Sequence, residues 1–404
     1  MTARFAAAGY VIVPAGTPSD VSVIHGCAIT GKAEHSSLYA ARQARRTRAD
    51  TLVILAGCPA ETLGEALRGD TSVDLAVGQG GKSALPDLLH RLHPVRFPAA
   101  GTTANPEAIP QFDTQRALIK AQDGCDFGCA YCVVPAARGA PVSRPIPEIV
   151  GEVRRVTDAG SREIVLTGAN LGRYKDDGNH LVDLIREIEA LPGLERIRLS
   201  SIELTTTEQA IVDYMADSAK LCHFLHIPLQ SGDDGILKAM GRRYDTDTYR
   251  RTVEKASEAI PFLGLGTDII VGFPGETDEA FENTVRLVRD LPFSNLHVFP
   301  YSRRSGTRAD TMAGQIPESV KKDRLHALVA LGESKRRLFA EGFAGRTVSV
   351  LIERVDSQGT GHGWTGEYLD ARVTGTGLTP RQVATMTVAR VSNATLIGSM
   401  ARRP

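Results

Sequence analysis

The sequence predicts an α/β protein in three parts: an N-terminal parallel α/β domain, a central partial barrel and a small all-β domain at the C-terminus. Short apolar runs alternate with amphipathic stretches over most of the chain, which is typical of parallel α/β folds. The alternation is longest between about residue 116 and about residue 302, enough for six βα units. From about residue 344 onward, β-branched runs separated by glycines favour a small all-β domain.

The bulk composition indicates a globular protein without membrane segments. The 404 residues are 42% hydrophobic and 23% charged, which suits two or three domains with packed cores. The 47 basic and 47 acidic residues cancel, which argues against a uniformly basic nucleic-acid coat and leaves room for a local basic face. Apolar runs fall short of the roughly 20 residues of a membrane helix, and the start has no convincing signal-peptide cleavage site. We therefore expect a cytoplasmic protein.

The N-terminal domain is expected to span residues 1–93. Residues 9–13, 21–24 and 51–55 are predicted strands, and the Arg-rich segment 32–48 is a predicted helix. A stretch with four prolines, residues 94–114, is the predicted linker to the next domain.

The central domain is expected to span residues 115–342, and the all-β domain residues 343–404. Between the barrel strands the apolar residues recur with helical periodicity, and a charged helix is predicted from about 317 to 343. The six predicted barrel strands are 117–122, 163–166, 196–200, 224–229, 266–271 and 296–300.

Three of the six cysteines lie in one short loop after the first predicted barrel strand. Cys125, Cys129 and Cys132 are spaced by three and then two residues, and loops after barrel strands lie on the catalytic face. Three thiolates can ligate three irons of a 4Fe–4S cluster and leave the fourth iron open to a ligand. Structural zinc is the alternative, but His223 or Cys222 would have to supply a fourth ligand from a strand half a barrel away. The spacing therefore favours the redox cluster.

This spacing, within six βα units, resembles the radical S-adenosylmethionine superfamily. The resemblance implies that the three cysteines are catalytic and that their cluster binds S-adenosylmethionine at its open iron. It also implies cofactor contacts from an aromatic residue before the third cysteine and from polar residues and glycines at the strand ends, although such residues occur in every barrel. These positions are Tyr131, Thr167, Gly168, Ser200, Ser201, Gln230, Asp268 and Phe299.

Over nearly its whole length the chain resembles the methylthiotransferase family within that superfamily. Cys27 and Cys58 each follow a predicted strand of the N-terminal domain, where the family ligates a second, auxiliary 4Fe–4S cluster. The all-β segment is similar to the TRAM domain, an RNA-binding module. The resemblance implies a flavodoxin-like N-terminal domain, tRNA as partner and a low-potential electron donor of the flavodoxin or ferredoxin type.

The N-terminal domain departs from the family pattern at its third cysteine ligand. The family uses three cysteines, and here only Cys27 and Cys58 match, with His25 and Gly26 in place of the usual Asn-Thr. A first strand with the missing cysteine would lie in the middle of a flavodoxin-type sheet, so we expect a gap between its neighbours. We expect that a start codon assigned too far downstream is the reason for the difference. A rebuilt auxiliary site, with His25 as the nearest third ligand, is the alternative.

Four stretches resemble the branch of the family that modifies threonylcarbamoyladenosine in tRNA, namely residues 196–203, 226–232, 297–302 and 363–368. The resemblance implies methylthiolation at C2 of that base next to the anticodon. One S-adenosylmethionine would methylate sulfur on the auxiliary cluster, and a second would yield the radical that activates the base. The alternatives are isopentenyladenosine in tRNA, an aspartate of a ribosomal protein, and a non-catalytic RNA-binding iron–sulfur protein with a degenerate auxiliary site.

The remaining candidates concern RNA and the last cysteine. Arg138, Trp364 and Tyr368 are candidate RNA contacts, whereas Cys222 has no role in this scheme and is expected to be a small buried side chain. Because the all-β domain lies outside the six βα units, we expect it to serve recognition, and its removal to leave cleavage of S-adenosylmethionine intact.

Overall fold

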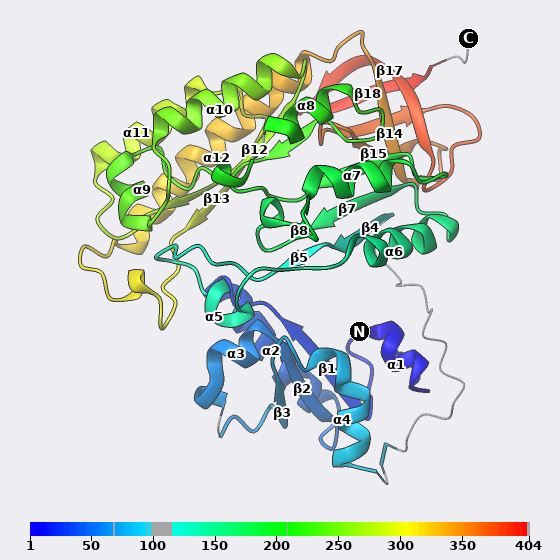
Figure 1. Cartoon of the computed structure of the whole chain (residues 1–404), viewed down its shortest axis with the longest axis vertical. Helices are drawn as coiled ribbons and strands as arrows, with labels where there is room; N and C mark the ends of the chain where they lie inside the picture. The colour runs from blue at the N-terminus through cyan, green and yellow to red at the C-terminus, as the bar shows by residue number, and fades with distance from the viewer. Residues whose placement is uncertain (68, 95, 98–114, 208, 402–404) are drawn as a thin grey trace. The chain divides into compact units, whose positions relative to one another are not determined.

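The computed structural model describes residues 1–401 apart from residues 68, 95, 98–114 and 208 (Figure 1). The chain forms two compact units. The first contains residues 1–111, 124–140 and 302–311, and the second contains residues 112–123, 141–301 and 312–404. The cysteine loop therefore belongs to the same unit as the N-terminal domain. Most of the predicted linker, residues 94–114, lies outside the described residues.

The first unit has a three-stranded parallel sheet of order β1-β2-β3. Its strands are β1 (Val21–Gly26), β2 (Leu52–Gly57) and β3 (Leu75–Val77). Its helices are α1 (Thr2–Ala7), α2 (Gly31–Thr47), α3 (Cys58–Leu63), α4 (Leu85–Leu92) and α5 (Val134–Arg138). Helix α2 begins after an N-cap in which the Thr30 hydroxyl accepts a hydrogen bond from the Ala33 amide at 3.2 Å.

Two expectations for this domain are wrong. Residues 9–13 form no strand; they follow α1 as a loop in which the Val11 side chain is 87% exposed, so its apolar character reflects no burial in a sheet. The expected gap in the sheet is also absent from the described strands. Instead β1 pairs directly with β2 from Val21 opposite Leu52 to Gly26 opposite Gly57. The backbone groups between the two strands are therefore satisfied by each other.

The second unit contains a partial barrel of six parallel strands, as predicted. They are β4 (Arg116–Lys120), β7 (Glu163–Thr167), β10 (Arg196–Leu199), β11 (Phe224–His226), β12 (Gly264–Val271) and β13 (Asn295–Pro300). They form two sheets, β10-β7-β4 and β11-β12-β13. A parallel bridge between Ile197 and Leu221, and a hydrogen bond from the Ile202 amide to the His226 carbonyl at 2.9 Å, connect the two sheets.

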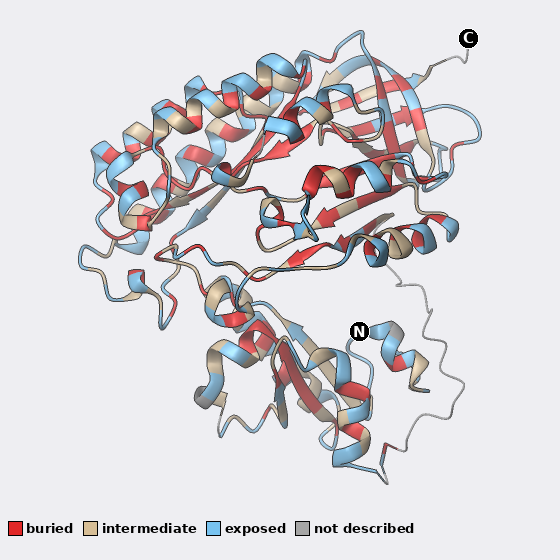
Figure 2. Cartoon of the chain, in the orientation of Figure 1, coloured by how far each residue is buried: buried red, intermediate tan, exposed pale blue. Residues whose placement is uncertain are grey.

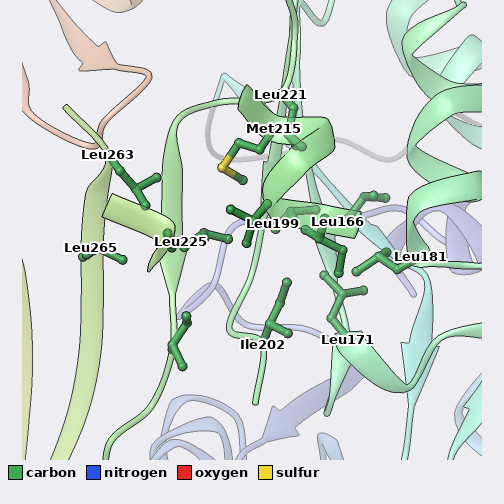
Figure 3. Close-up of a cluster of buried hydrophobic side chains, with 14 of the residues drawn as sticks. Leu166, Leu171, Leu181, Leu199, Ile202, Met215, Leu221, Leu225, Leu263 and Leu265 are labelled. Carbon is green, nitrogen blue, oxygen red and sulfur yellow. The ribbon is translucent and has the colours of Figure 1, made fainter. Parts of the chain in front are cut away.

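Alternating side chains of these strands build the main core with the surrounding helices. Leu166, Leu199, Leu225 and Leu265, each from a different strand, belong to one buried cluster (Figure 3). The buried faces of the strands and helices are turned toward each other (Figure 2). Burying a side chain of this size contributes about 2 kcal/mol. The helices of this unit are α6 (Ile146–Asp158), α7 (Leu181–Glu189), α8 (Gln209–Asp217), α9 (Asp234–Met240), α10 (Thr246–Ala259), α11 (Asp278–Asp290) and α12 (Glu318–Glu341).

The C-terminal segment is a small closed β-barrel of strand order β14-β15-β16-β18-β17, which confirms the predicted all-β domain. Its strands are β14 (Thr347–Val355), β15 (Gly361–Thr365), β16 (Asp370–Thr374), β17 (Val383–Ser392) and β18 (Thr395–Met400). It has a hydrophobic core of its own, which includes Ile352, Met386 and Leu396. Within the described part of the chain, no helix is long and apolar enough to span a membrane.

Candidate active site

The three clustered cysteines lie on a loop whose backbone is fixed by local hydrogen bonds. The Cys125 amide donates to the Gly139 carbonyl at 3.0 Å, and the Cys132 amide donates to the Cys129 carbonyl at 3.2 Å. Just before the loop, Gly124 has φ +74°, and a Cβ there would lie 2.1 Å from the Ala140 carbonyl oxygen. Only glycine suits this conformation and this close approach.

Backbone amides of the loop point at two of the thiol sulfurs. The Phe127 amide lies 3.5 Å from Cys125 Sγ, and the Val134 amide lies 3.4 Å from Cys132 Sγ. Hydrogen bonds of this kind stabilise thiolates and tune the potential of an iron–sulfur cluster. All three cysteines are partly exposed, so the loop presents its sulfurs instead of burying them in a core.

A segment far along the chain supports the same loop. The Ala309 amide donates to the Ala130 carbonyl at 2.9 Å, and the Arg308 guanidinium donates to the Gly128 carbonyl. Within this unit Arg304 also pairs with Glu34 of α2. The cysteine loop is therefore held in part by residues that follow the last barrel strand.

The two remaining cysteines of the first unit differ in exposure. Cys58, at the start of α3, is 2% exposed, and its sulfur accepts hydrogen bonds from Gln79 Nε2 at 3.0 Å and from Arg138 Nε at 3.4 Å. Cys27, after β1, is exposed. Arg138 therefore donates a hydrogen bond to a cysteine sulfur. Its contact with RNA stays a prediction.

In the second unit, the predicted cofactor residues lie on or after consecutive strands, most of them toward the carboxyl ends. Thr167 ends β7, and Ser200 follows β10. Gln230 follows β11, whereas Asp268 and Phe299 lie within β12 and β13. Parallel strands present these ends on one side of a barrel, where ligands bind. Tyr131, by contrast, belongs to the cysteine loop of the first unit.

The backbone is specialised at two of these positions. Gln230 has a backbone φ of +70°. Residues other than glycine adopt this conformation at a cost of order 1–3 kcal/mol. Gln230 is held there because its amide donates to the Asp268 carbonyl and its carbonyl accepts from Ile270. At Gly168 a Cβ would lie 2.9 Å from Gln122 Oε1, so glycine lets the chain pass close to that side chain.

The site also contains a cluster that sequence reasoning missed. His226, Asp268 and His297 bring two imidazoles and a carboxylate within 4.8 Å of one another. Burial alone would raise the pKa of Asp268, but the contacts from His226 and His297 outweigh burial and hold that pKa well below its usual range. The only available signal was the position of each residue on adjacent predicted strands.

Trp364, near the end of β15, and Tyr368, on the turn that follows, belong to a segment of the β-domain that docks against the barrel strands of the same unit. The buried Arg198 donates to Glu163 Oε1 at 2.7 Å and to the carbonyls of Thr365 and Gly366. Its guanidinium lies 4.3 Å from the centroid of the Tyr368 ring, which also packs on Phe224. We call residues 364–368 the docking turn. RNA contact by Trp364 and Tyr368 stays a prediction, because the structure uses this turn to join the two domains.

Comparisons with known proteins agree with this arrangement. Residues 119–288 match the Radical SAM superfamily, and residues 1–78 match the Uncharacterized protein family UPF0004. The threonylcarbamoyladenosine tRNA methylthiotransferase MtaB of Bacillus subtilis is 33% identical over 92% of this chain and 86% of its own length. The protein of the same name from Chlamydia pneumoniae is 35% identical, over 95% of this chain and 89% of its own length.

Another relative carries a different name. The tRNA-2-methylthio-N(6)-dimethylallyladenosine synthase of Cereibacter sphaeroides is 36% identical over 88% of this chain and 83% of its own length. The partial barrel, the cysteine loop and these matches define an enzyme of the radical S-adenosylmethionine class, which uses a 4Fe–4S cluster and S-adenosylmethionine. Within that class, the chain belongs to the methylthiotransferase family, whose members are transferases.

A solved structure shares the fold. The radical S-adenosylmethionine methyltransferase TsrM from Kitasatospora setae superposes with a TM-score of 0.56 at 17% identity. The match covers 72% of this chain and spans 64% of that protein. At this identity the likeness concerns the architecture alone.

Proposed function

We propose that this enzyme adds a methylthio group to C2 of threonylcarbamoyladenosine next to the anticodon of tRNA. The observation that carries the proposal is the set of relatives with that activity in their names, which are 33–35% identical over 86–95% of this chain. Dimethylallyladenosine in tRNA is the second candidate base, because the relative from Cereibacter sphaeroides is equally similar. tRNA is the proposed partner in both cases, and the cytoplasm is the proposed location.

For the catalytic centre, we assign the 4Fe–4S cluster to Cys125, Cys129 and Cys132. When bound, the cluster and S-adenosylmethionine supply a carbon radical, which acid–base side chains cannot supply at neutral pH. The protein contributes placement. Amide N–H groups directed at Cys125 and Cys132 favour the thiolate form that iron requires.

The strand-end residues fit a polar cofactor. Ser200 Oγ is buried without a hydrogen-bond partner among the described residues, as expected for a hydroxyl that serves a ligand. The strained backbone of Gln230 is a second indication of a binding role. We assign Thr167 and Gly168 to the methionine group, and Asp268 and Gln230 to the ribose hydroxyls. The remaining contacts are assigned to Ser200, Ser201, Phe299 and, beside the adenine, Tyr131.

We further propose that Cys27 and Cys58 ligate an auxiliary 4Fe–4S cluster. The two N–H donors at Cys58 Sγ suit a thiolate ligand. Cys27 and Cys58 supply two ligands, and His25 is the nearest candidate for a third. The His25 ring packs close to the backbone just before Cys58, because a Cβ at Gly57 would lie 2.9 Å from that ring. A low-potential flavodoxin or ferredoxin is the proposed electron donor. Iron analysis tests the second cluster: about eight irons per chain are expected, and about four would refute it.

Nucleoside analysis of tRNA tests the substrate. In a strain that lacks this protein, mass spectrometry should show threonylcarbamoyladenosine without its methylthio group, and the gene supplied in trans should restore the modification. A Cys129→Ala gene is the matched control and should not restore it. Loss of the methylthio group from dimethylallyladenosine alone would favour the second candidate base. Unchanged tRNA nucleosides would refute both.

A further inference from the structure

Two imidazoles contact the same oxygen of Asp268 on the inner face of the partial barrel. His226 Nε2 lies 3.0 Å from Asp268 Oδ1, and His297 Nδ1 lies 3.3 Å from the same oxygen. The centroids of the two rings are 5.1 Å apart. Asp268 is therefore flanked from both neighbouring strands.

Strand register produces this arrangement. Asp268 of β12 is opposite His297 of β13, and His226 of β11 is opposite Gly266, two residues before Asp268. Side chains alternate along a strand, so residues 266 and 268 share the face opposite to the fully buried Thr267. A Cβ at Gly266 would lie 2.6 Å from His226 Nδ1, so the glycine leaves room for the ring beside Asp268.

Exposure increases from one side of the cluster to the other. The side chains of His226, Asp268 and His297 are 7%, 24% and 49% exposed. His226 Nε2 is buried, and the described residues give it no aligned hydrogen bond despite its closeness to Asp268. The 3.0 Å contact nevertheless helps to hold the pKa of Asp268 down, so His226 is a charge-assisted partner of the carboxylate. The cluster opens toward solvent on the His297 side.

The second imidazole has a defined orientation. His297 Nε2 lies 3.4 Å from Asn295 Nδ2. When that amide donates, the proton of the neutral imidazole resides on Nδ1, which faces Asp268. Both imidazoles contact Oδ1, and among the described residues Oδ2 has no hydrogen-bond partner. Oδ2 therefore retains its acceptor capacity.

We propose that His226 and His297 are positioning residues that orient the Asp268 carboxylate, so that Oδ2 accepts a hydrogen bond from a ribose hydroxyl of S-adenosylmethionine. The inference rests on the cofactor role of Asp268 proposed above. A carboxylate held on one oxygen by two neighbours loses little rotational freedom when it binds, and such preorganisation strengthens binding. Neither histidine needs to touch the cofactor.

The experiment measures binding of S-adenosylmethionine to the full-length, anaerobically reconstituted enzyme. Replacement of either histidine by leucine should raise the Kd about tenfold, because an oriented charge-assisted contact is lost. Conservative variants separate positioning from packing. His226→Gln keeps an amide nitrogen near the Nε2 position and His297→Asn keeps one near Nδ1, so both should bind within about threefold of wild type. His326→Leu, on the exposed face of α12, is the matched control and should not change the Kd.

Two further readouts test the mechanism of the effect. At saturating S-adenosylmethionine the leucine variants should cleave the cofactor at nearly the wild-type kcat, so the loss should be in KM. An analogue that lacks the ribose 2′-hydroxyl should bind wild type more weakly, but should lose little further affinity in Asp268→Asn. Equal iron content across the variants controls for folding of the cluster loop. If His226→Leu does not fold, the Kd of His297→Leu tests the positioning role by itself, because the His297 side chain is half-exposed and its replacement should not disturb folding.

Three outcomes would overturn the inference. If Asp268→Asn binds S-adenosylmethionine as wild type does, the proposed cofactor role of Asp268 fails and the positioning role fails with it. If Asp268→Asn binds weakly but both leucine variants bind normally, only the positioning role fails. If the enzyme binds one equivalent of Zn²⁺ that His226→Leu abolishes and that excludes S-adenosylmethionine, the cluster is a metal site, for which two imidazoles and a carboxylate are suitable ligands.

Discussion

Replacement of Arg198 by methionine should weaken the docking of the β-domain on the barrel. Arg198 is 1% exposed, and its three hydrogen bonds connect Glu163 of β7 with the carbonyls of Thr365 and Gly366 in the docking turn. Methionine preserves much of the stem and removes the guanidinium. The variant therefore weakens the joint, which keeps the hydrogen bond from Arg196 to the Trp364 carbonyl, and leaves both hydrophobic cores intact.

The size of the effect follows from the contacts that are lost. A hydrogen bond to a charged group contributes about 1.5–3 kcal/mol, and each carbonyl left without its donor costs about 1 kcal/mol or more. The cation–π contact with Tyr368 adds about 1–2 kcal/mol. Glu163 keeps a second partner, because Arg196 Nη1 lies 3.2 Å from its Oε2. Because contacts made by one side chain do not contribute additively, we expect the loss of about 3–5 kcal/mol that is typical of a broken buried ion pair and not the sum of these values.

The chain contains a built-in probe for this experiment. Trp364 is its single tryptophan and lies on the docking turn, so its fluorescence in a urea titration reports on docking. Arg198→Met should shift the midpoint to lower urea, and the matched variant Arg372→Met, at an exposed site of β16, should change stability by about 0.5 kcal/mol or less. Equal midpoints for the two variants would refute the assigned role of the docking turn.

Three further predictions follow from the same contacts. Removal of residues 344–404 should reduce the solubility of the protein and its cleavage of S-adenosylmethionine, because the buried Arg196 and Arg198 lose their carbonyl partners in the β-domain. A soluble fragment that still cleaves the cofactor would show instead that the barrel works independently of the β-domain. Alanine at Cys125, Cys129 or Cys132 should abolish cofactor cleavage, measured as 5′-deoxyadenosine, whereas Cys222→Ala should retain it. Because the folded-state pKa of Asp268 is lowered, its stabilisation is complete above the unfolded value of about 3.9 and is lost as pH falls toward the folded pKa. Between pH 6 and pH 3 the Tm of the cluster-free protein should therefore fall less in Asp268→Asn than in wild type.

The barrel was predictable because its strands are short apolar runs, whereas its helices have apolar residues that recur with helical periodicity. All six predicted strands are present, and their ends differ from the prediction by up to three residues. β3 was missed because it has only three residues, and residues 9–13 were misassigned because an apolar run alone does not distinguish a strand from an exposed loop. Local propensity contains no information about partners, and a strand requires one.

The placement of the strand-end residues was predictable for a different reason. Parallel strands place their carboxyl ends on one side, so sequence order alone brings Thr167, Ser200 and Gln230 to that side. The pairing of Asp268 with both histidines depends on register across three strands, which the sequence does not reveal. The docking of Tyr368 on Arg198 depends on a contact between two domains and was equally hidden.

The discontinuity of the first unit has a consequence for how the enzyme matures on the ribosome. Gly128, in the cysteine loop, is bonded by Arg308, which follows it by 180 residues. At 5–20 residues per second, the segment that completes the loop is synthesised roughly 9–36 s after the loop itself. During that interval the nascent chain presents three cysteines on a loop that lacks its hydrogen bonds from Arg308 and Ala309. We therefore expect iron and sulfide to enter the fully supported site only after the barrel has been translated, and the partly exposed thiols to need protection from oxidation until then.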